Sequence, residues 1–172
     1  TGGNGGGGIA AARHRATGGV DVSVVLTRAP ADLTGAAATQ YVILDVTSVP
    51  ISVGSDGFRP GATETVVDAL VGYGLSGPLR GTAGDLVEAI PEQSATVVAL
   101  DVPSGIDATT GDAPGPSVTP DVTLTLALPK TGLEDVQGRL VLGDIGIPAM
   151  VFERAGIEYE NPFDGYRVEL QK

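Results

Sequence analysis

The feature that most constrains the fold is an apolar run at residues 95–100 that ends abruptly in two carboxylates, a proline, a serine and a glycine at residues 101–107. Apolar runs of this length, bounded by turn-forming residues, are typical of a strand that is covered on both faces. In open parallel sheets, ligands bind beyond the carboxyl ends of such strands. We therefore expect a buried strand here and place Asp101, Ser104 and Asp107 at the mouth of a crevice. A simple turn with Asp107 as its cap would give the same pattern.

The remainder of the chain alternates between strand and helix patterns, which predicts a doubly wound α/β domain. Several of the expected strands end in polar loops that would lie on the same edge of one sheet. We expect strands at residues 20–27, 41–46 with 51–53, 65–72, 97–101, 121–127, 139–142 and 166–170, and helices at residues 9–14, 29–39, 82–90 and 148–155.

Length, charge and cysteine content exclude several classes of protein. A chain of 172 residues is long enough for one domain with a single core. Because it has no cysteine and one histidine, it can form neither a disulfide nor a thiolate or multi-histidine metal site. No apolar run approaches the length of about 18 residues that a membrane span needs, and no signal-peptide pattern is present, so we expect a cytoplasmic protein without membrane contacts. A formal net charge of -11 argues against nucleic-acid binding.

A glycine-rich segment opens the chain and precedes the helix-forming run at residues 9–14. A glycine loop that leads into a helix N-terminus presents unpaired N–H groups and suits a phosphate. Gly3, Gly5 and Gly8 match the pattern G-x-G-x-x-G. However, no strand precedes them and the strand at 20–27 does not end in a carboxylate, which argues against a dinucleotide-dependent dehydrogenase. A flexible terminus is the alternative interpretation.

Asp68 is an unusual residue because it interrupts the apolar strand expected at residues 65–72. Burying an isolated carboxylate is costly unless a partner or a cation compensates for it. Asp68 therefore either lies at the exposed end of the strand and caps the next loop, or binds a ligand. The loop that follows, residues 72–78, is rich in glycine, and its Tyr73 could stack on a ring or cover the sheet edge.

Four segments of the sequence, residues 4–14, 67–78, 100–107 and 124–132, together resemble the YjeF N-terminal domain family, the NAD(P)H-hydrate epimerases. The resemblance implies a Rossmann-like three-layer αβα sandwich with a mostly parallel central sheet, usually as a homodimer. It also implies an isomerase that interconverts the R and S forms of hydrated NADH and NADPH, so that a fused or separate S-specific dehydratase can repair both.

The same resemblance assigns roles to individual residues. It implies a potassium ion (K⁺) held by Asn4, Asp68 and Ser104, whose hard oxygen atoms suit such an ion. It also implies that two glycine-rich segments wrap the nucleotide and that Asp101 meets the hydrated ring. The nucleotide-binding residues would be Gly3, Asn4, Gly5, Gly6, Gly7, Gly72, Tyr73, Gly74, Leu75, Ser76, Gly77, Pro78 and Asp101. Asp101 is also our candidate for the catalytic acid and base, provided that burial favours its protonated form.

The sequence departs from the family pattern at two places. The family's glycine loop usually reads Asn-Asn-Gly-Gly-Asp-Gly, and here Gly3 and Gly7 stand where the first asparagine and the aspartate belong. A catalytically silent nucleotide-binding or dimerisation module on the same fold is therefore the alternative. The family's N-terminal helical region and first strand also have no counterpart before Thr1. We therefore expect residues 1–172 to be a single-domain fragment, or to receive the missing strand from another segment.

The charge distribution predicts that the protein is halophilic. Only Lys130 and Lys172 are lysines, against 21 aspartate and glutamate residues. In concentrated salt, repulsion between surface charges is screened within a few ångströms. We expect the melting temperature to rise with KCl concentration and the protein to unfold at low salt. A melting temperature that does not depend on KCl would instead indicate an ordinary acidic protein.

Overall fold

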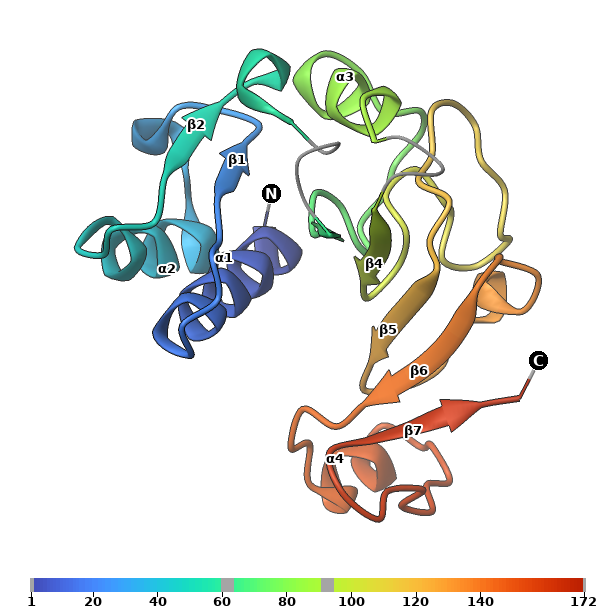
Figure 1. Ribbon diagram of the computed structural model, residues 1–172. Helices are drawn as coiled ribbons and strands as arrows, with labels where there is room; N and C mark the ends of the chain where they lie inside the picture. Colours follow the sequence, from blue (N-terminus) through green and yellow to red (C-terminus); the bar gives the residue numbers. More distant parts are fainter. Residues whose placement is uncertain (1, 60–63, 91–94, 172) are drawn as a thin grey trace.

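The computed structural model describes residues 2–59, 64–90 and 95–171, which form alternating helices and strands (Figure 1). The helices are α1 (Gly2–Thr17), α2 (Gly35–Asp45), α3 (Thr82–Glu88) and α4 (Ala149–Arg154). The strands are β1 (Val24–Leu26), β2 (Ile51–Val53), β3 (Thr65–Asp68), β4 (Thr96–Leu100), β5 (Val122–Leu126), β6 (Arg139–Gly143) and β7 (Arg167–Leu170).

The strands form two sheets within the described residues. Five strands are ordered β3-β4-β5-β6-β7, and all neighbours run parallel except the antiparallel pair β6 and β7. Strands β1 and β2 form a separate parallel pair. The predicted Rossmann-like α/β architecture with mostly parallel strands is confirmed, although the expected single sheet is divided into two.

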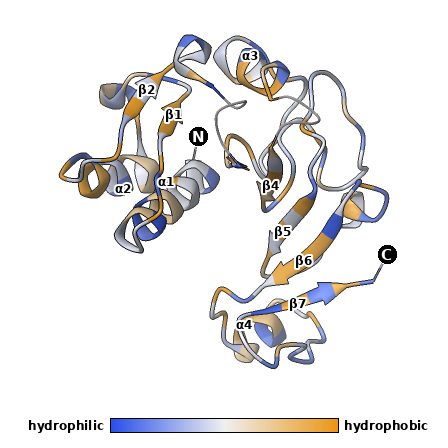
Figure 2. Ribbon diagram, viewed as in Figure 1, coloured by the Kyte–Doolittle hydropathy of each residue, from blue (hydrophilic) through white to orange (hydrophobic). Residues whose placement is uncertain are grey.

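Helices pack on both faces of the five-stranded sheet. Side chains alternate between the faces of a strand, so Val97 and Leu100 of β4 point to opposite sides. Val97 packs with Val87 of α3 in one apolar cluster, whereas Leu100 lies beneath α1. A second cluster joins α1 and α2 to the strands β1 and β2, and its buried members are Ile9, Leu26, Ala37 and Leu44. Hydrophobic residues gather along β1, β2 and β6 (Figure 2).

The prediction of a glycine loop at the start of the chain is wrong, because α1 runs without interruption from Gly2 to Thr17. Glycine in a helix costs about 1 kcal/mol relative to alanine because it loses more backbone freedom. Tertiary packing overrides this preference. The helix predicted at residues 9–14 is therefore only the second half of the observed one.

Close contacts explain why glycine is required in α1. A Cβ atom at Gly6 would lie 2.8 Å from Cβ of Ala36 in α2, and one at Gly8 would lie 2.5 Å from Cβ of Ala69, just after β3. A Cβ atom at Gly7 would lie 2.9 Å from a methyl group of the last residue of β4. The absence of side chains thus lets one helix approach α2, β4 and the end of β3 together.

The strand predicted at residues 41–46 is also wrong, because residues 41–45 belong to α2 and Val46 caps it. Ala37 and Leu44 are seven positions apart and both are buried against α1, which is the spacing of one helix face. The Tyr41 hydroxyl donates to the Asp45 carboxylate one turn later, at 2.8 Å. Packing of this face outweighs the strand preference of the β-branched residues Val42 and Ile43.

The other predicted elements are confirmed with shifted ends. Strand β1 is shorter than the range expected from the apolar run, and β3 ends at Asp68 rather than at Gly72. The short helices α3 and α4 lie within the predicted ranges. Across the described ranges, no helix combines the length and the apolar character that crossing a membrane requires.

Adjacent glycines of α1 should respond in opposite ways to alanine. A Cβ atom at Gly5 would have only ordinary contacts, the nearest at 3.9 Å, so we expect Gly5→Ala to stabilise the protein by about 0.5–1 kcal/mol. At Gly6 the added methyl group would press on the backbone of Ala36 at 3.0 Å, so Gly6→Ala should destabilise it by about 1–3 kcal/mol. Urea unfolding of both variants measures the change in the free energy of unfolding. Shifts of the same sign would contradict the packing argument.

Candidate functional site

The carboxyl ends of β3, β4 and β5 meet at one edge of the five-stranded sheet. These neighbouring strands are parallel, and the register pairs Asp68 with Ala99 and Leu100 with Leu124. The polar residues that follow each strand are therefore neighbours in space. This edge holds Asp68, Asp101 and Ser104, as the apolar runs predicted, and it also holds Lys130.

Asp68 is buried against Ser104. The side chain of Asp68 is 2% exposed and that of Ser104 is fully buried. The backbone N–H of Ser104 donates to Asp68 Oδ2 at 2.7 Å, and the Ser104 hydroxyl donates to Oδ1 at 2.6 Å. The idea that Asp68 lies at an exposed strand end is wrong, although its Oδ1 also accepts the N–H of Leu70 at 3.2 Å.

Burial raises the pKa of Asp68 above its ordinary value. Loss of hydration disfavours the ionised carboxylate, and the hydrogen bonds from Ser104 and Leu70 oppose this effect only in part. A buried acid of this kind is stabilised in its charged form by a cation or by further donors. Asp68 is thus a carboxylate whose surroundings favour a positive partner.

Asn4 reaches the same region from α1. A Cβ atom on Gly72 would lie 3.1 Å from Cγ of Asn4, so the amide borders the segment after β3. The Ser104 hydroxyl accepts the N–H of Val71 at 2.9 Å, in the same segment. Asn4 and Ser104 therefore both lie beside the segment that begins with Asp68, so the three residues come together as the family resemblance implied. Among the described residues, the buried Asn4 Nδ2 finds no hydrogen-bond partner.

Asp101 follows β4 in a strained conformation. Its φ of 68° lies in the left-handed region, which residues with a Cβ rarely adopt. Its Oδ1 accepts Lys130 Nζ at 2.5 Å and the N–H of Leu126 at 3.3 Å. Its Oδ2 accepts the N–H of Tyr73 at 3.3 Å. The turn thus directs the carboxylate back across the ends of β3 and β5.

Lys130 is a site residue that the sequence analysis did not identify. Its side chain is 14% exposed, beside an Asp101 side chain that is 16% exposed. Lysine is scarce in this acidic chain, and that scarcity could have drawn attention to Lys130.

The second glycine segment, residues 72–78, is an irregular loop as predicted. Gly72 is buried between Asn4 and Asp101, while Tyr73 is 68% exposed. Tyr73 therefore does not cover the sheet edge, and its ring is free to meet a ligand. The remaining predicted residues, Gly74, Leu75, Ser76, Gly77 and Pro78, continue this loop, with Leu75 partly buried.

Asp107 does not join the site but caps the loop after it. Its carboxylate accepts the N–H groups of Thr109 and Thr110 at 2.8 and 2.9 Å. These bonds lower the pKa of Asp107, with the Thr110 bond contributing most. The placement of Asp107 at the mouth of a crevice is wrong, and the alternative of a cap is confirmed.

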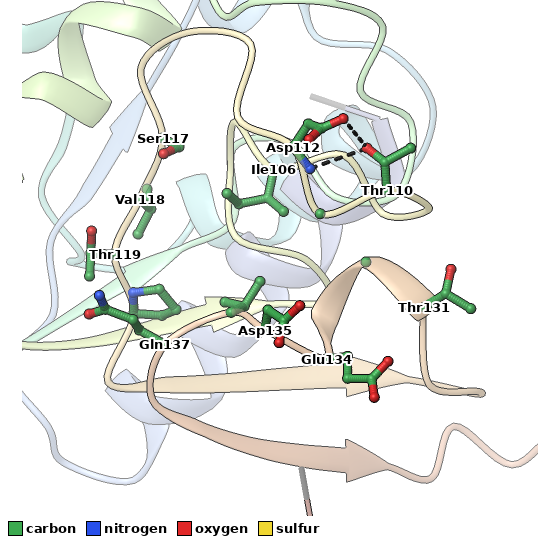
Figure 3. A pocket seen from close by; sticks show the side chains of 14 residues that line it. Ile106, Thr110, Asp112, Ser117, Val118, Thr119, Thr131, Glu134, Asp135 and Gln137 are labelled. Carbon is green, nitrogen blue, oxygen red and sulfur yellow. Dashed lines mark hydrogen bonds between the residues drawn. The ribbon is translucent and has the colours of Figure 1, made fainter.

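A cavity of about 560 Å³ lies between the loops at residues 106–120 and 131–137 (Figure 3). Asp112, Glu134 and Asp135 line it, whereas Asn4, Asp68 and Asp101 do not. Its described lining contains no lysine or arginine. A phosphate-bearing ligand is repelled by this charge distribution, so the cavity is a poor candidate for a nucleotide site.

A parallel sheet with its polar residues gathered beyond the carboxyl ends of the strands, next to the first turn of a helix, defines the class of Rossmann-like α/β domains. Within this class, the chain belongs to the family described as YjeF-related protein N-terminus, whose model matches residues 1–132.

Several relatives are similar along most of the chain. An NAD(P)H-hydrate epimerase of Dehalogenimonas lykanthroporepellens is 41% identical over 176 residues, which cover 99% of this chain and 70% of that protein. A bifunctional NAD(P)H-hydrate repair enzyme Nnr of Hyperthermus butylicus is 39% identical over 155 residues, which cover 86% of this chain and 29% of that enzyme. The chain thus spans less than a third of the bifunctional relative.

A solved structure supports the fold. The crystal structure of yeast ynu0 superimposes with a TM-score of 0.78, covering 97% of this chain and 73% of that chain, at 24% sequence identity.

Proposed function

We propose that this protein is an NAD(P)H-hydrate epimerase, an isomerase that interconverts the R and S forms of hydrated NADH and NADPH. The observation that carries the proposal is the Asp101 carboxylate. It is held at the carboxyl edge of the sheet, and one of its oxygen atoms accepts only a single long hydrogen bond among the described residues. Relatives named as epimerases match 85% or more of the chain at 36–41% identity.

One carboxyl group can carry out both halves of the reaction. In the first half, the C–O bond of the hydrated ring breaks and its electron pair leaves with the oxygen, which takes the carboxyl proton of Asp101 to form water. The ring nitrogen lone pair forms a C=N bond. In the second half, water adds to the other face of this carbon, the C=N electrons return to nitrogen, and the proton lost by the water returns to Asp101.

The nucleotide would lie across the first turn of α1 and the loop at residues 72–78. Gly3, Asn4 and Gly5 are in the first turn, where N–H groups have no partner within the helix and attract an anion. Gly6 and Gly7 lie deeper in the helix, where their N–H groups bond to carbonyls of the preceding turn. A phosphate group would therefore bind at the helix terminus rather than in the loop that the sequence suggested.

A potassium ion fits the residues that surround segment 68–72. Asp68 supplies a buried carboxylate whose pKa is raised by desolvation, Ser104 supplies a hydroxyl oxygen, and Asn4, which borders the same segment, would supply its amide oxygen. Oxygen atoms of this kind suit a hard cation. When bound, the ion would compensate for the charge of Asp68 and order the segment beside the nucleotide.

Family membership is also the basis for our proposals about the partners and the location of the protein. We infer that the protein acts with a dehydratase domain, because one of the similar proteins is a bifunctional NAD(P)H-hydrate repair enzyme. A homodimer in the cytoplasm is proposed from the family resemblance alone. A catalytically silent nucleotide-binding module is the second candidate, since Gly3 and Gly7 replace polar residues of the family pattern.

Asp68 gives the stability a dependence on pH that potassium should remove. A carboxyl whose pKa is higher in the folded protein stabilises it below the unfolded pKa, and this contribution is lost as pH rises through the folded pKa. In choline chloride we expect the melting temperature to fall as the pH rises above about 4, the ordinary pKa of an aspartate, more steeply than in Asp68→Asn. KCl at equal ionic strength should restore stability at pH 7 in the unmodified protein but not in Asp68→Asn. Asp21→Asn, at an exposed site, is the control. Equal slopes in all three proteins would contradict the role of Asp68.

Epimerisation itself tests the proposed function. The protein should convert the R epimer of hydrated NADH into the S epimer, as followed by chromatography. Asp101→Asn should lower kcat by about 10²–10⁴-fold, the usual contribution of an acid–base group, while titration calorimetry shows retained NADH binding. Asp112→Asn, in the acidic cavity, is the control and should keep the rate of the unmodified protein. Saturable binding without epimerisation would favour the silent module.

A further inference from the structure

Lys130 is held in the site by two hydrogen bonds. Its ammonium donates to Asp101 Oδ1 at 2.5 Å and to the carbonyl of Leu126, the last residue of β5, at 2.7 Å. Both the lysine and the aspartate are mostly buried. An ion pair removed from water in this way fixes the orientation of its members far more firmly than an exposed pair does.

Backbone strain is concentrated around this pair. Among the described residues other than glycine, positive φ values occur only at Asp101, with 68°, and at Ala127, with 66°. Such a conformation is unfavourable and persists only where its surroundings hold it in place. Asp101 directly follows β4 and Ala127 directly follows β5, so the strained turns flank the contact between Asp101 and Lys130.

The two oxygen atoms of Asp101 have different surroundings. Oδ1 accepts two bonds, from Lys130 and from the N–H of Leu126. Oδ2 accepts one long bond, from the N–H of Tyr73. Gly72 lies close to Oδ2, because a Cβ atom there would be 3.1 Å from this oxygen and 3.1 Å from Cγ of Asn4. Oδ2 is therefore the oxygen with fewer donors, beside the predicted nucleotide-binding residues Asn4 and Gly72.

We propose that Lys130 is a positioning residue for the epimerisation: it holds Oδ1 of Asp101, so that Oδ2 is the atom that gives a proton to the departing hydroxyl and recovers one from the added water. This inference rests on the proposed function. Because Oδ1 is already bonded to two donors, the transferred proton is carried on Oδ2, on the side of Gly72 and Asn4. Lys130 itself neither gains nor loses a proton.

Three variants test the role of Lys130 in epimerisation of the R epimer of hydrated NADH. Lys130→Met removes both hydrogen bonds at similar length, and we expect kcat to fall on the order of 100-fold, the effect of misplacing a catalytic group, with KM nearly unchanged. Lys130→Arg keeps the charge and should give an intermediate kcat. The control is Arg139→Met, which removes the exposed ion pair with Glu169, 2.8 Å apart, and should leave kcat unchanged.

A further variant tests the other oxygen atom of Asp101, Oδ2, which is not hydrogen-bonded to Lys130. Gly72→Ala places a methyl group beside Oδ2 and should lower kcat/KM even if Lys130→Met does not fold. Melting temperatures of all variants show which of them are folded.

The outcomes separate this inference from the proposed function. If the unmodified protein does not epimerise the substrate, the proposed function fails and this inference fails with it. If it is active and folded Lys130→Met keeps kcat within about twofold, or raises KM alone, only the positioning role fails, since uniform binding changes KM without kcat. Full activity of folded Gly72→Ala would overturn the assignment of Oδ2.

Discussion

The buried contact between Asp68 and Ser104 is the interaction on which the rest of the site depends. It joins the end of β3 to the loop after β4 through both carboxylate oxygens, in a region that water does not reach. Buried carboxylates are tolerated only when donors surround them, so this bond also fixes where Asp101 leaves β4. Asp101 then reaches across to Lys130 and Leu126 after β5. Three strands thereby present their polar residues as one surface.

Much of the fold follows from local sequence patterns, and the exceptions have physical reasons. Strands β4, β5 and β6 are recognisable because short apolar runs end in turn residues, and the apolar residues of β6 are buried. Helix α1 was not recognisable over its first half, since glycine has a low helix propensity and only tertiary contacts, such as that of Gly6 with Ala36, explain its presence. Packing against α1 also makes residues 41–45 helical.

The site, like the fold, contains residues that the sequence identified and residues that it did not. Asp68, Asp101 and Ser104 could be selected from the sequence because each is a polar residue next to an apolar run, and parallel strands bring such residues together. Lys130 also follows an apolar run, but its contact with Asp101 could not be predicted, because that contact depends on the left-handed turns at Asp101 and Ala127. Asp107 shows the opposite error, since a carboxylate after a glycine serves equally well to cap a loop.

The close packing of α1 links the site mechanically to a distant part of the surface. Asn4 and Gly6 belong to the same rigid helix, and Gly6 rests on the backbone of α2 with no side chain between them to absorb movement. Close-packed interiors transmit displacement rather than dampening it. A shift of α2, whose outer face exposes Val42 and Ile43, would therefore be passed on to Asn4. The small residues that allow the fold to close also make its nucleotide edge sensitive to whatever touches the opposite side of that helix.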